Sequence, residues 1–470
     1  MKYERIQYRA PFSNVVCIAR YNGKINAEQI KNALEKIVAM HPLLSSKIVL
    51  KGSKTYYVYT GNKEYDLKII QKQSDRQWVS IAKEEQAMPF SPSEGKLARF
   101  ILLFSEKTSD LILVVHHAIC DGLSLIYLIK HITAILNGSM VSKIFLPSTI
   151  NENTVRGLIK PSFPSNLLIK WMNRRWSKSK YFFSDDEYYD MFKRYWSQCD
   201  VGLKLVELDS TWLSKLIDKC HDYNVTVHSA LCVALLLAQM KFQKKTYTDN
   251  TEVLNIINSA VNIRKMLTND PGEAMGLYVS SISTMFKPTY ENITEPLSIN
   301  SYSHSYSNID FLQRNLVSPL FWKHVCDFNR QFKKDLNSPL PLYLPGLLNS
   351  IEQSLLDAMY FHLYAGFDNE AAALMSKLYG FKKNRTSIGI SNLGNVLQEY
   401  CDGKHNGGKH SDKNISIDTV FFLPPYWPNL EKMVGVVSAG GKMNITIQYS
   451  KSTVREEIIE NIVKYLTSIV

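Results

Sequence analysis

Apolar residues in the first 140 positions follow two patterns, one typical of strands and one typical of helices. Loose alternation predicts a first strand at 15–22, and two continuous apolar runs, 97–104 and 111–118, predict buried strands separated by a polar loop. Asn26 is a suitable N-cap for a helix that ends at His41-Pro42, and His41 is expected to cap it. Further strands are expected at 56–60 and 66–71, and further helices at 76–87 and 122–136.

The second half of the chain repeats this mixture of helices and strands. Helices are expected at 210–222, 227–242, 308–333, 347–364 and 453–468. Strands are expected at 252–263, 276–286, 386–391, 395–399, 415–422, 433–438 and 443–449. Both halves therefore predict an α/β (α+β) fold in two lobes, each a mixed β-sheet flanked by helices.

The segment between these halves differs in character. Residues 138–205 contain scattered prolines and a stretch rich in tryptophan and basic residues, 165–181. We interpret it as a connector, which gives an N-terminal lobe at 1–165, a connector at 166–205 and a C-terminal lobe at 206–470. The alternative is contact with a membrane surface through that basic stretch; an interdomain strap is the preferred interpretation.

Composition sets the class of protein. A length of 470 residues with 45% hydrophobic residues suits two or three packed units, and the net charge of +12 is a weak argument for nucleic acid. We expect no nucleic-acid partner. The seven cysteines show no metal-binding spacing, no window of apolar residues is long enough to span a bilayer, and the N-terminus lacks a signal-peptide core. We therefore expect a cytoplasmic protein without a metal, and the polar loop 402–413 with His405 and His410 is expected to be solvated.

The stretch "VVHHAICDGLSL" combines titratable groups at the exit of a predicted strand. Neighbouring residues of a strand point to opposite faces, so only one of His116 and His117 can reach a given cleft. A neutral imidazole near pH 7 can act as a general base. Asp121 follows after a turn, and Gly122 opens a helix whose amide groups could face developing negative charge. Cys120 is interpreted as a small packed side chain rather than a nucleophile.

"HHAICDG" resembles the signature of the chloramphenicol-acetyltransferase-like superfamily, which includes condensation domains and alcohol acetyltransferases. "LEKIVAMHPLLSSKI", "PFSPSEGKLARFILL", "SAVNIR", "SIGISNLG" and "GGKMNITIQYS" are similar to other segments of that group, in the same order. The Asp-Phe-Gly-Trp-Gly motif of the plant branch is absent. The resemblance is greatest to free-standing alcohol acetyltransferases or standalone condensation-type proteins.

The resemblance implies a tunnel between the lobes and a role for each motif residue. His117 would be the general base, Gly122 would contribute a backbone amide near the oxyanion, and His116 would be structural. Asp121 would pair with Arg264 of the second lobe, and a bidentate pair is expected. Ser391 and Asn392 are candidates to line the tunnel, although they could simply form a turn.

The function that the resemblance implies is acyl transfer. The donor would be an acyl thioester of coenzyme A or of a phosphopantetheine arm on a carrier protein, and the acceptor an alcohol or an amine. No permanently bound cofactor is expected. The alternative is a non-catalytic protein of the same fold that binds a carrier protein or a lipid. The sequence does not distinguish acceptors.

Overall fold

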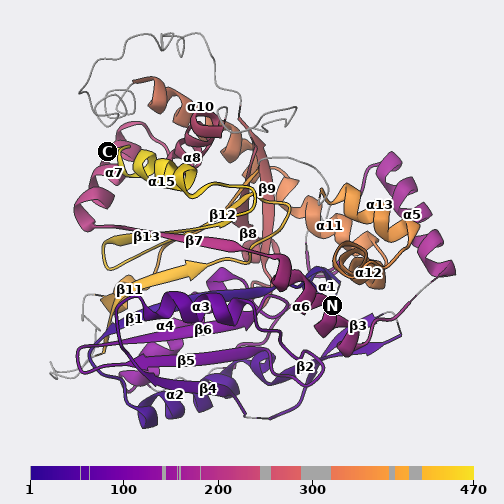
Figure 1. Ribbon diagram of the computed structural model, residues 1–470, viewed down its shortest axis with the longest axis horizontal. Coiled ribbons are helices and arrows are strands. Elements are labelled where there is room, and N and C mark those ends of the chain that lie inside the picture. Colours follow the sequence, from indigo (N-terminus) through magenta and orange to yellow (C-terminus); the bar gives the residue numbers. More distant parts are fainter. Residues whose placement is uncertain are drawn as a thin grey trace.

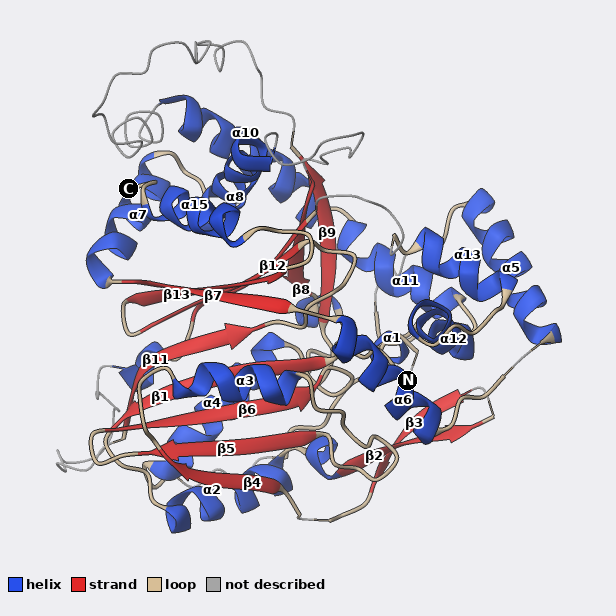
Figure 2. Ribbon diagram, viewed as in Figure 1, coloured by secondary structure: helices blue, strands red, loops and turns tan. Residues whose placement is uncertain are grey.

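Two mixed β-sheets dominate the computed structural model (Figures 1 and 2). The structure describes residues 2–470 except 53, 63, 140–143, 156, 158–159, 180, 244–255, 287–318, 381–386 and 402–414. The expected polar loop with His405 and His410, and the first part of the helix expected at 308–333, therefore lie outside the described residues. The α/β class predicted from the sequence is confirmed.

The first sheet has five strands in the order β11-β1-β6-β5-β4. Only the β4–β5 pair is parallel. The strands are β1 (Asn14–Asn22), β4 (Asp66–Gln71), β5 (Ala98–Phe104), β6 (Thr108–His116) and β11 (Ser416–Leu423).

Helices cover both faces of this sheet, which explains the continuous apolar runs in its strands. Val15 and Cys17 of β1 belong to the core beneath α2 (Ala27–Met40) and α4 (Gly122–Leu136). Val16 belongs to the core beneath α3 (Gln77–Gln86), together with Trp78. The predicted N-cap Asn26 accepts a hydrogen bond from Gln29 N in a capping box.

The second sheet has six strands in the order β7-β13-β12-β10-β8-β9. They are β7 (Val201–Leu208), β8 (Ile256–Asn262), β9 (Val279–Met285), β10 (Ile388–Asn395), β12 (Lys432–Ala439) and β13 (Lys442–Ser450). The helices on this sheet are α7 (Ser210–Asp222), α8 (Val227–Gln243), α10 (Pro319–Leu336) and α15 (Glu456–Thr467) (Figure 1).

A third group of helices lies at one end of the molecule (Figure 1). It contains α5 (Phe163–Lys178), α6 (Asp185–Gln198), α11 (Tyr343–Ser350), α12 (Gln353–Tyr364) and α13 (Glu370–Leu378). The N-terminal α1 (Arg5–Tyr8) is attached to this group by a buried ion pair between Arg5 and Asp357. The hairpin of β2 (Ser46–Lys51) and β3 (Lys54–Tyr59) pairs as a separate two-stranded sheet. Short elements are η1 (Pro42–Ser45), η2 (Arg264–Met266), η4 (Leu340–Leu342) and α14 (Gln398–Cys401).

Strand β11 joins the two sheets. It comes from the C-terminal half of the chain but pairs with β1 of the first sheet. Three side chains of β13 donate to β11 and the residue that follows it: Asn444 to Val420 O, Thr446 to Phe422 O and Gln448 to Pro424 O. Each buried carbonyl is thereby satisfied, which fixes the first sheet against the second.

Several sequence predictions are wrong in detail. No strand forms at 395–399, because Leu397 has a φ of 57° and the chain turns into α14 there. The helix expected at 347–364 is broken at the extended Ile351, which separates α11 from α12. The polar loop expected between the apolar runs 97–104 and 111–118 is shorter than predicted. Its last residues belong to β6, where the buried Asp110 pairs with Arg20.

The segment interpreted as a connector also holds more regular structure than expected. Helix α5 begins with a proline in its first turn, a position that suits helix initiation. The strand β7 completes one edge of the second sheet and was not predicted. No single helix in the described part of the chain has the length and apolarity needed to cross a membrane, while α7 and α8, bent by 101°, meet that criterion only as a pair.

Candidate functional site

His117 lies at the point where the chain leaves the central strand of the first sheet. Strand β6 ends at His116, and the backbone N–H of His117 still donates to Ser13 O at 2.7 Å. The side chain turns back on its own loop, with Nδ1 2.7 Å from Cys120 O. Because a carbonyl oxygen only accepts, this contact places the proton on Nδ1 and leaves the lone pair on Nε2.

The environment of His117 favours the neutral form of its ring. Burial lowers the pKa of His117, while the hydrogen bond to Cys120 O and the charge of Asp121 act in the opposite direction. The side chain is 7% exposed and lines a cavity. Among the described residues, Nε2 has no protein hydrogen-bond partner, so its lone pair is available to a molecule in that cavity.

His116 faces away from this cavity. Its ring is fully buried, accepts a hydrogen bond from Ala118 N at 3.2 Å and packs edge-on against Phe90. Burial, assisted by the neighbouring His117, lowers the pKa of His116 to about 3. The two histidines thus occupy different environments, which is what opposite strand faces lead one to expect.

Cys120 is buried within the loop. Its thiol donates weakly to Val115 O and His116 O, and burial raises the pKa of Cys120 well above its ordinary value. A thiol that resists ionisation is a poor nucleophile. The packing role expected for Cys120 agrees with this environment.

Asp121 forms the N-cap of α4. Its Oδ1 accepts hydrogen bonds from the backbone N–H of Ser124 at 2.7 Å and from the Ser124 hydroxyl at 2.8 Å, and the two residues form a capping box. The cap closes the first turn of α4 directly behind the His117 loop. Ser124 was not singled out in the sequence, because the usual partner three residues after an N-cap is Glu or Gln.

Arg264, the first residue of η2, reaches Asp121 from the other half of the chain. Its Nη2 donates to Asp121 Oδ1 at 3.0 Å and to the Ser124 hydroxyl at 2.9 Å, and all three side chains are buried. Its Nη1 donates to the carbonyls of Gly272 and Ala274. One guanidinium thus connects α4 to the loop that precedes β9.

The expectation of a bidentate Asp–Arg pair is wrong. Only one guanidinium nitrogen of Arg264 contacts Asp121, because Nη1 is committed to two backbone carbonyls. The second carboxylate oxygen, Oδ2, accepts from the backbone N–H of Tyr278 at 3.0 Å. Asp121 therefore holds the second half of the chain through a side chain and a backbone amide.

Gly122 is the first residue of α4 and lines the same cavity as His117. A Cβ atom there would lie 2.6 Å from Leu393 Cδ2 and 3.0 Å from Phe422 Cζ. A larger residue at 122 would therefore force the tips of Leu393 and Phe422 to shift, and the backbone conformation itself does not call for glycine.

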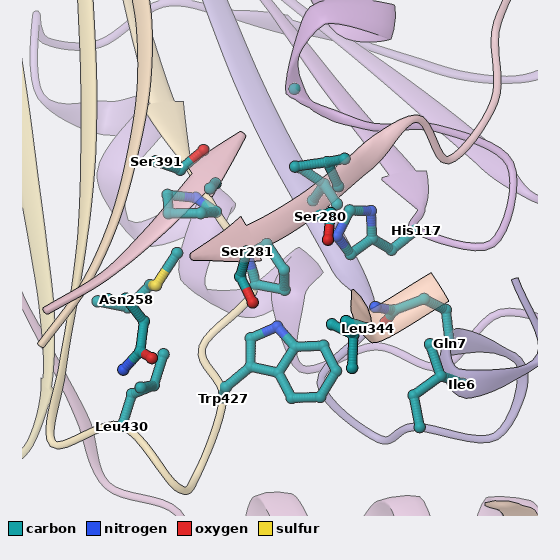
Figure 3. Close-up of a pocket in the computed structure, with 18 of the residues that line it drawn as sticks. Ile6, Gln7, His117, Asn258, Ser280, Ser281, Leu344, Ser391, Trp427 and Leu430 are labelled. Atoms are coloured by element: carbon teal, nitrogen blue, oxygen red, sulfur yellow. The ribbon is translucent and has the colours of Figure 1, made fainter. Parts of the chain in front are cut away.

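The cavity has a volume of about 230 Å³ and is lined by both halves of the chain. Figure 3 shows the His117 ring near Ser280, with Asn258, Trp427 and Leu430 farther along. The lining is uncharged among the described residues; besides those named, it includes Tyr3, Gln7, Leu277, Leu344, Leu348, Tyr379, Gly389, Met433 and others.

The sequence identified only some of these residues. Ser391 lines the cavity, whereas Asn392 does not: its Oδ1 accepts from Gly394 N at 2.9 Å and forms a turn. Asn258, Ser280 and Trp427 were missed. Asn258 directly precedes the recognised segment 259–264 but is not part of it, the other two lie outside the quoted motifs, and only the tertiary structure brings the three together.

Neither the cavity nor the rest of the described chain contains three His, Cys, Asp or Glu side chains arranged to hold a metal ion. The His117–Cys120 contact and the uncharged lining suit proton transfer within an organic substrate complex.

Sequence comparison with known proteins finds matches in the N-terminal part of the chain. The family model of the Condensation domain matches residues 6–143, which contain the His117 loop. A segment of 126 residues is 26% identical to part of a plipastatin synthase protein of Bacillus subtilis (strain 168), and it represents 27% of this chain and 5% of that much longer protein.

Solved structures extend the likeness to the whole chain. The TRI3 trichothecene 15-O-acetyltransferase of Fusarium sporotrichioides matches with a TM-score of 0.59 and 11% identity, over 100% of this chain and 94% of that one. A double mutant of the starter condensation domain of rhizomide synthetase RzmA, in complex with C8-CoA, matches with a TM-score of 0.51 and 10% identity, over 99% and 91% of the two chains. The chain has the condensation-domain fold. For this condensation-fold protein, identity this low establishes only the architecture, and the chemistry has to be argued from the site.

Proposed function

We propose that this protein is an acyltransferase that moves an acyl group from a thioester to an alcohol or amine, with His117 as general base. The observation that carries the proposal is the state of the His117 ring. Its Nδ1–H is anchored on Cys120 O, and its Nε2 lone pair is available inside a cavity lined by both halves of the chain.

The first step is addition. His117 Nε2 takes the proton of the acceptor O–H or N–H as the acceptor oxygen or nitrogen bonds to the thioester carbonyl carbon. The carbonyl π electrons move to oxygen and form a tetrahedral oxyanion. Gly122 lies at the N-terminal end of α4 and in the cavity wall, and its backbone N–H is the proposed hydrogen-bond donor to this oxyanion.

The second step is elimination. The oxyanion re-forms the carbonyl, the C–S bond breaks, and the thiolate takes the proton from His117 Nε2. The ring returns to its neutral state, so neither a metal nor an acyl-enzyme is needed for the atoms and charges to balance. Asp121 and Arg264 position the loop and do not exchange protons in this scheme.

The donor is proposed to be an acyl thioester of coenzyme A or of a phosphopantetheine arm. Support comes from the C8-CoA bound to the RzmA domain of the same fold and from the acetyl transfer named for TRI3. A carrier protein would be the partner in the second case.

The test is thiol release from a panel of acyl-CoA donors, measured with and without alcohols and amines as acceptors. The parent protein is expected to release thiol in an acceptor-dependent way, and His117→Ala is expected to lose about 10²–10⁴-fold in rate. His362→Ala is the matched control, because His362 Nδ1 also contacts a backbone carbonyl, Phe367 O, but lies outside the cavity lining. Equal rates in His117→Ala and the parent would remove His117 from the mechanism.

The second candidate is a non-catalytic binding protein of this fold. It predicts that an acyl-CoA or acyl-carrier protein binds, and that no acceptor yields an acylated product. Binding by both the parent and His117→Ala, without turnover by either, would favour this candidate.

A further inference from the structure

The outer face of α5 presents bulky apolar side chains to solvent. Phe163 is 77% exposed, Leu167 53% and Trp171 40%. Their spacing of four residues places them on one side of the helix. Single exposed apolar residues are ordinary, but a row of three large ones on one helix face needs an explanation.

The inner face of α5 is fully committed to the protein. Ile169, Met172 and Trp176 are buried in the core, and Trp176 Nε1 donates to Ser354 Oγ at 2.9 Å. The Asn173 side chain donates to Ser350 O and accepts from Glu352 N, at the junction of α11 and α12. These contacts fix the position of α5 through its inner face alone. They do not explain why the outer face carries apolar side chains.

The charge on the same face has one sign. Lys170, Arg174 and Lys178 are exposed and alternate with the apolar row. Between Glu152 and Asp185 the sequence holds seven basic residues and no acidic one. Arg175 lies at the side of the helix, over the Trp171 ring at 5.4 Å and 3.7 Å from the exposed Glu370 of α13.

We infer that α5 is a docking surface for an anionic lipid bilayer. Tryptophan, phenylalanine and leucine side chains insert at the boundary between headgroups and acyl chains, and neighbouring cations bind anionic headgroups. The sequence alone favoured an interdomain strap for this segment; the exposure of the apolar row on a firmly mounted helix is what changes that interpretation.

The surface lies in the same helical group as part of the cavity wall. Leu344 and Leu348 of α11 line the cavity, and α11 ends at Ser350, to which Asn173 of α5 is bonded. Docking through α5 would hold the cavity close to the bilayer. The inference does not depend on acyl transfer, because vesicle binding is measured without substrate.

The test is co-sedimentation of the full chain with vesicles of phosphatidylcholine alone or mixed with phosphatidylserine. Binding is expected only with phosphatidylserine, and it should weaken as salt is raised because headgroup attraction is screened. Replacing Arg174 and Lys178 with Gln should weaken binding roughly 30-fold, from the attraction contributed by each cation. Trp171→Ser should weaken binding roughly 10-fold or more through lost apolar burial.

The matched control replaces Lys215 and Lys219 with Gln. Both are exposed on α7, at the other end of the molecule from α5, and the net charge changes by the same amount (Figure 1). This variant should bind like the parent. Absence of binding to phosphatidylserine vesicles at low salt overturns the inference, and so does equal weakening in the α7 control. Binding of soluble polyaspartate through α5 without vesicle binding would also overturn it and would indicate an acidic protein partner.

Discussion

Asp121 and Arg264, 143 residues apart in the sequence, are joined by a buried hydrogen bond of 3.0 Å between Oδ1 and Nη2. The contact connects the N-cap of the helix behind the His117 loop to the start of the turn before β9. Only Nη2 of Arg264 contacts Asp121. The other carboxylate oxygen of Asp121 accepts from Tyr278 N, and Nη1 of Arg264 donates to the carbonyls of Gly272 and Ala274. The proposed base is therefore held by both halves of the chain at once.

Removing the carboxylate of Asp121 should destabilise the protein strongly. Asp121→Ala leaves the Arg264 guanidinium buried without its counter-charge, and a loss of about 3–5 kcal/mol in the free energy of unfolding is expected. Denaturant titration measures it. Asp209→Ala is the control, because Asp209 also caps a helix by accepting from Trp212 N at 2.8 Å. No arginine in the described part of the chain pairs with it, so a loss of about 1 kcal/mol is expected. Equal losses in the two variants would mean that the Arg264 contact contributes nothing beyond capping.

The rate of acyl transfer should decline with falling pH only below the pH at which an ordinary histidine becomes protonated. Burial lowers the pKa of His117 from 6.5, so its Nε2 stays unprotonated and able to accept a proton as the pH falls through that value. The profile of kcat/KM against pH is expected to have its acid limb below pH 6.5. In Asp121→Asn the limb should move to still lower pH, because the Asp121 charge raises this pKa. An acid limb above pH 6.5 in the parent would contradict the assigned environment of His117.

Folding stability should fall in mild acid because of buried histidines outside the cavity. Burial, followed by the neighbouring His131, lowers the pKa of His41 from 6.5 to about 3. Between these values the unfolded chain binds a proton that the folded chain does not, so stability is lost as the pH falls below 6.5. The loss should reach about 2 kcal/mol per such histidine at pH 5.

The variant that isolates this effect is His41→Gln. The slope of unfolding free energy against pH, measured between pH 5 and 6, should drop by about 1.4 kcal/mol per pH unit relative to the parent. An unchanged slope in His41→Gln would show that this ring already titrates normally in the folded protein.

A methyl group at position 122 should disturb the cavity wall. In Gly122→Ala the new Cβ meets Leu393 Cδ2 and Phe422 Cζ, and overpacking of this kind typically costs about 1–3 kcal/mol. Both stability and acyl transfer should fall, as measured by thermal unfolding and thiol release. Adding Leu393→Ala opens space at the shorter of the two contacts and should restore part of the stability. A double variant no more stable than Gly122→Ala would show that the contact with Leu393 is not the cause.

Local chemistry explains which parts of the fold the sequence predicted. Helix α4 begins at Gly122 and ends at Leu136 as expected, because Asp121 caps one end and Asn137-Gly138 follows the other. The pairing of β11 with β1 could not be predicted, since it joins residues about 400 positions apart and depends on the side chains of β13.

The candidate site also contains residues that a local motif reveals and residues that only the tertiary structure brings together. His116, His117, Asp121 and Gly122 share one short motif, so the sequence placed them together. Asn258, Ser280 and Trp427 approach the cavity from separate segments, and no local pattern marks a polar strand residue or a loop tryptophan as cavity lining. The apolar row of α5 was visible as composition, but its exposure depends on which helix face packs inward.

The most direct measurement is the rate of acyl transfer by His117→Ala with and without added imidazole. We expect that the variant, folded as the parent is, loses about 10²–10⁴-fold in rate and that imidazole filling the vacated space restores part of it. A folded His117→Ala protein that transfers acyl groups as fast as the parent, with no response to imidazole, would contradict the role of this ring as the base.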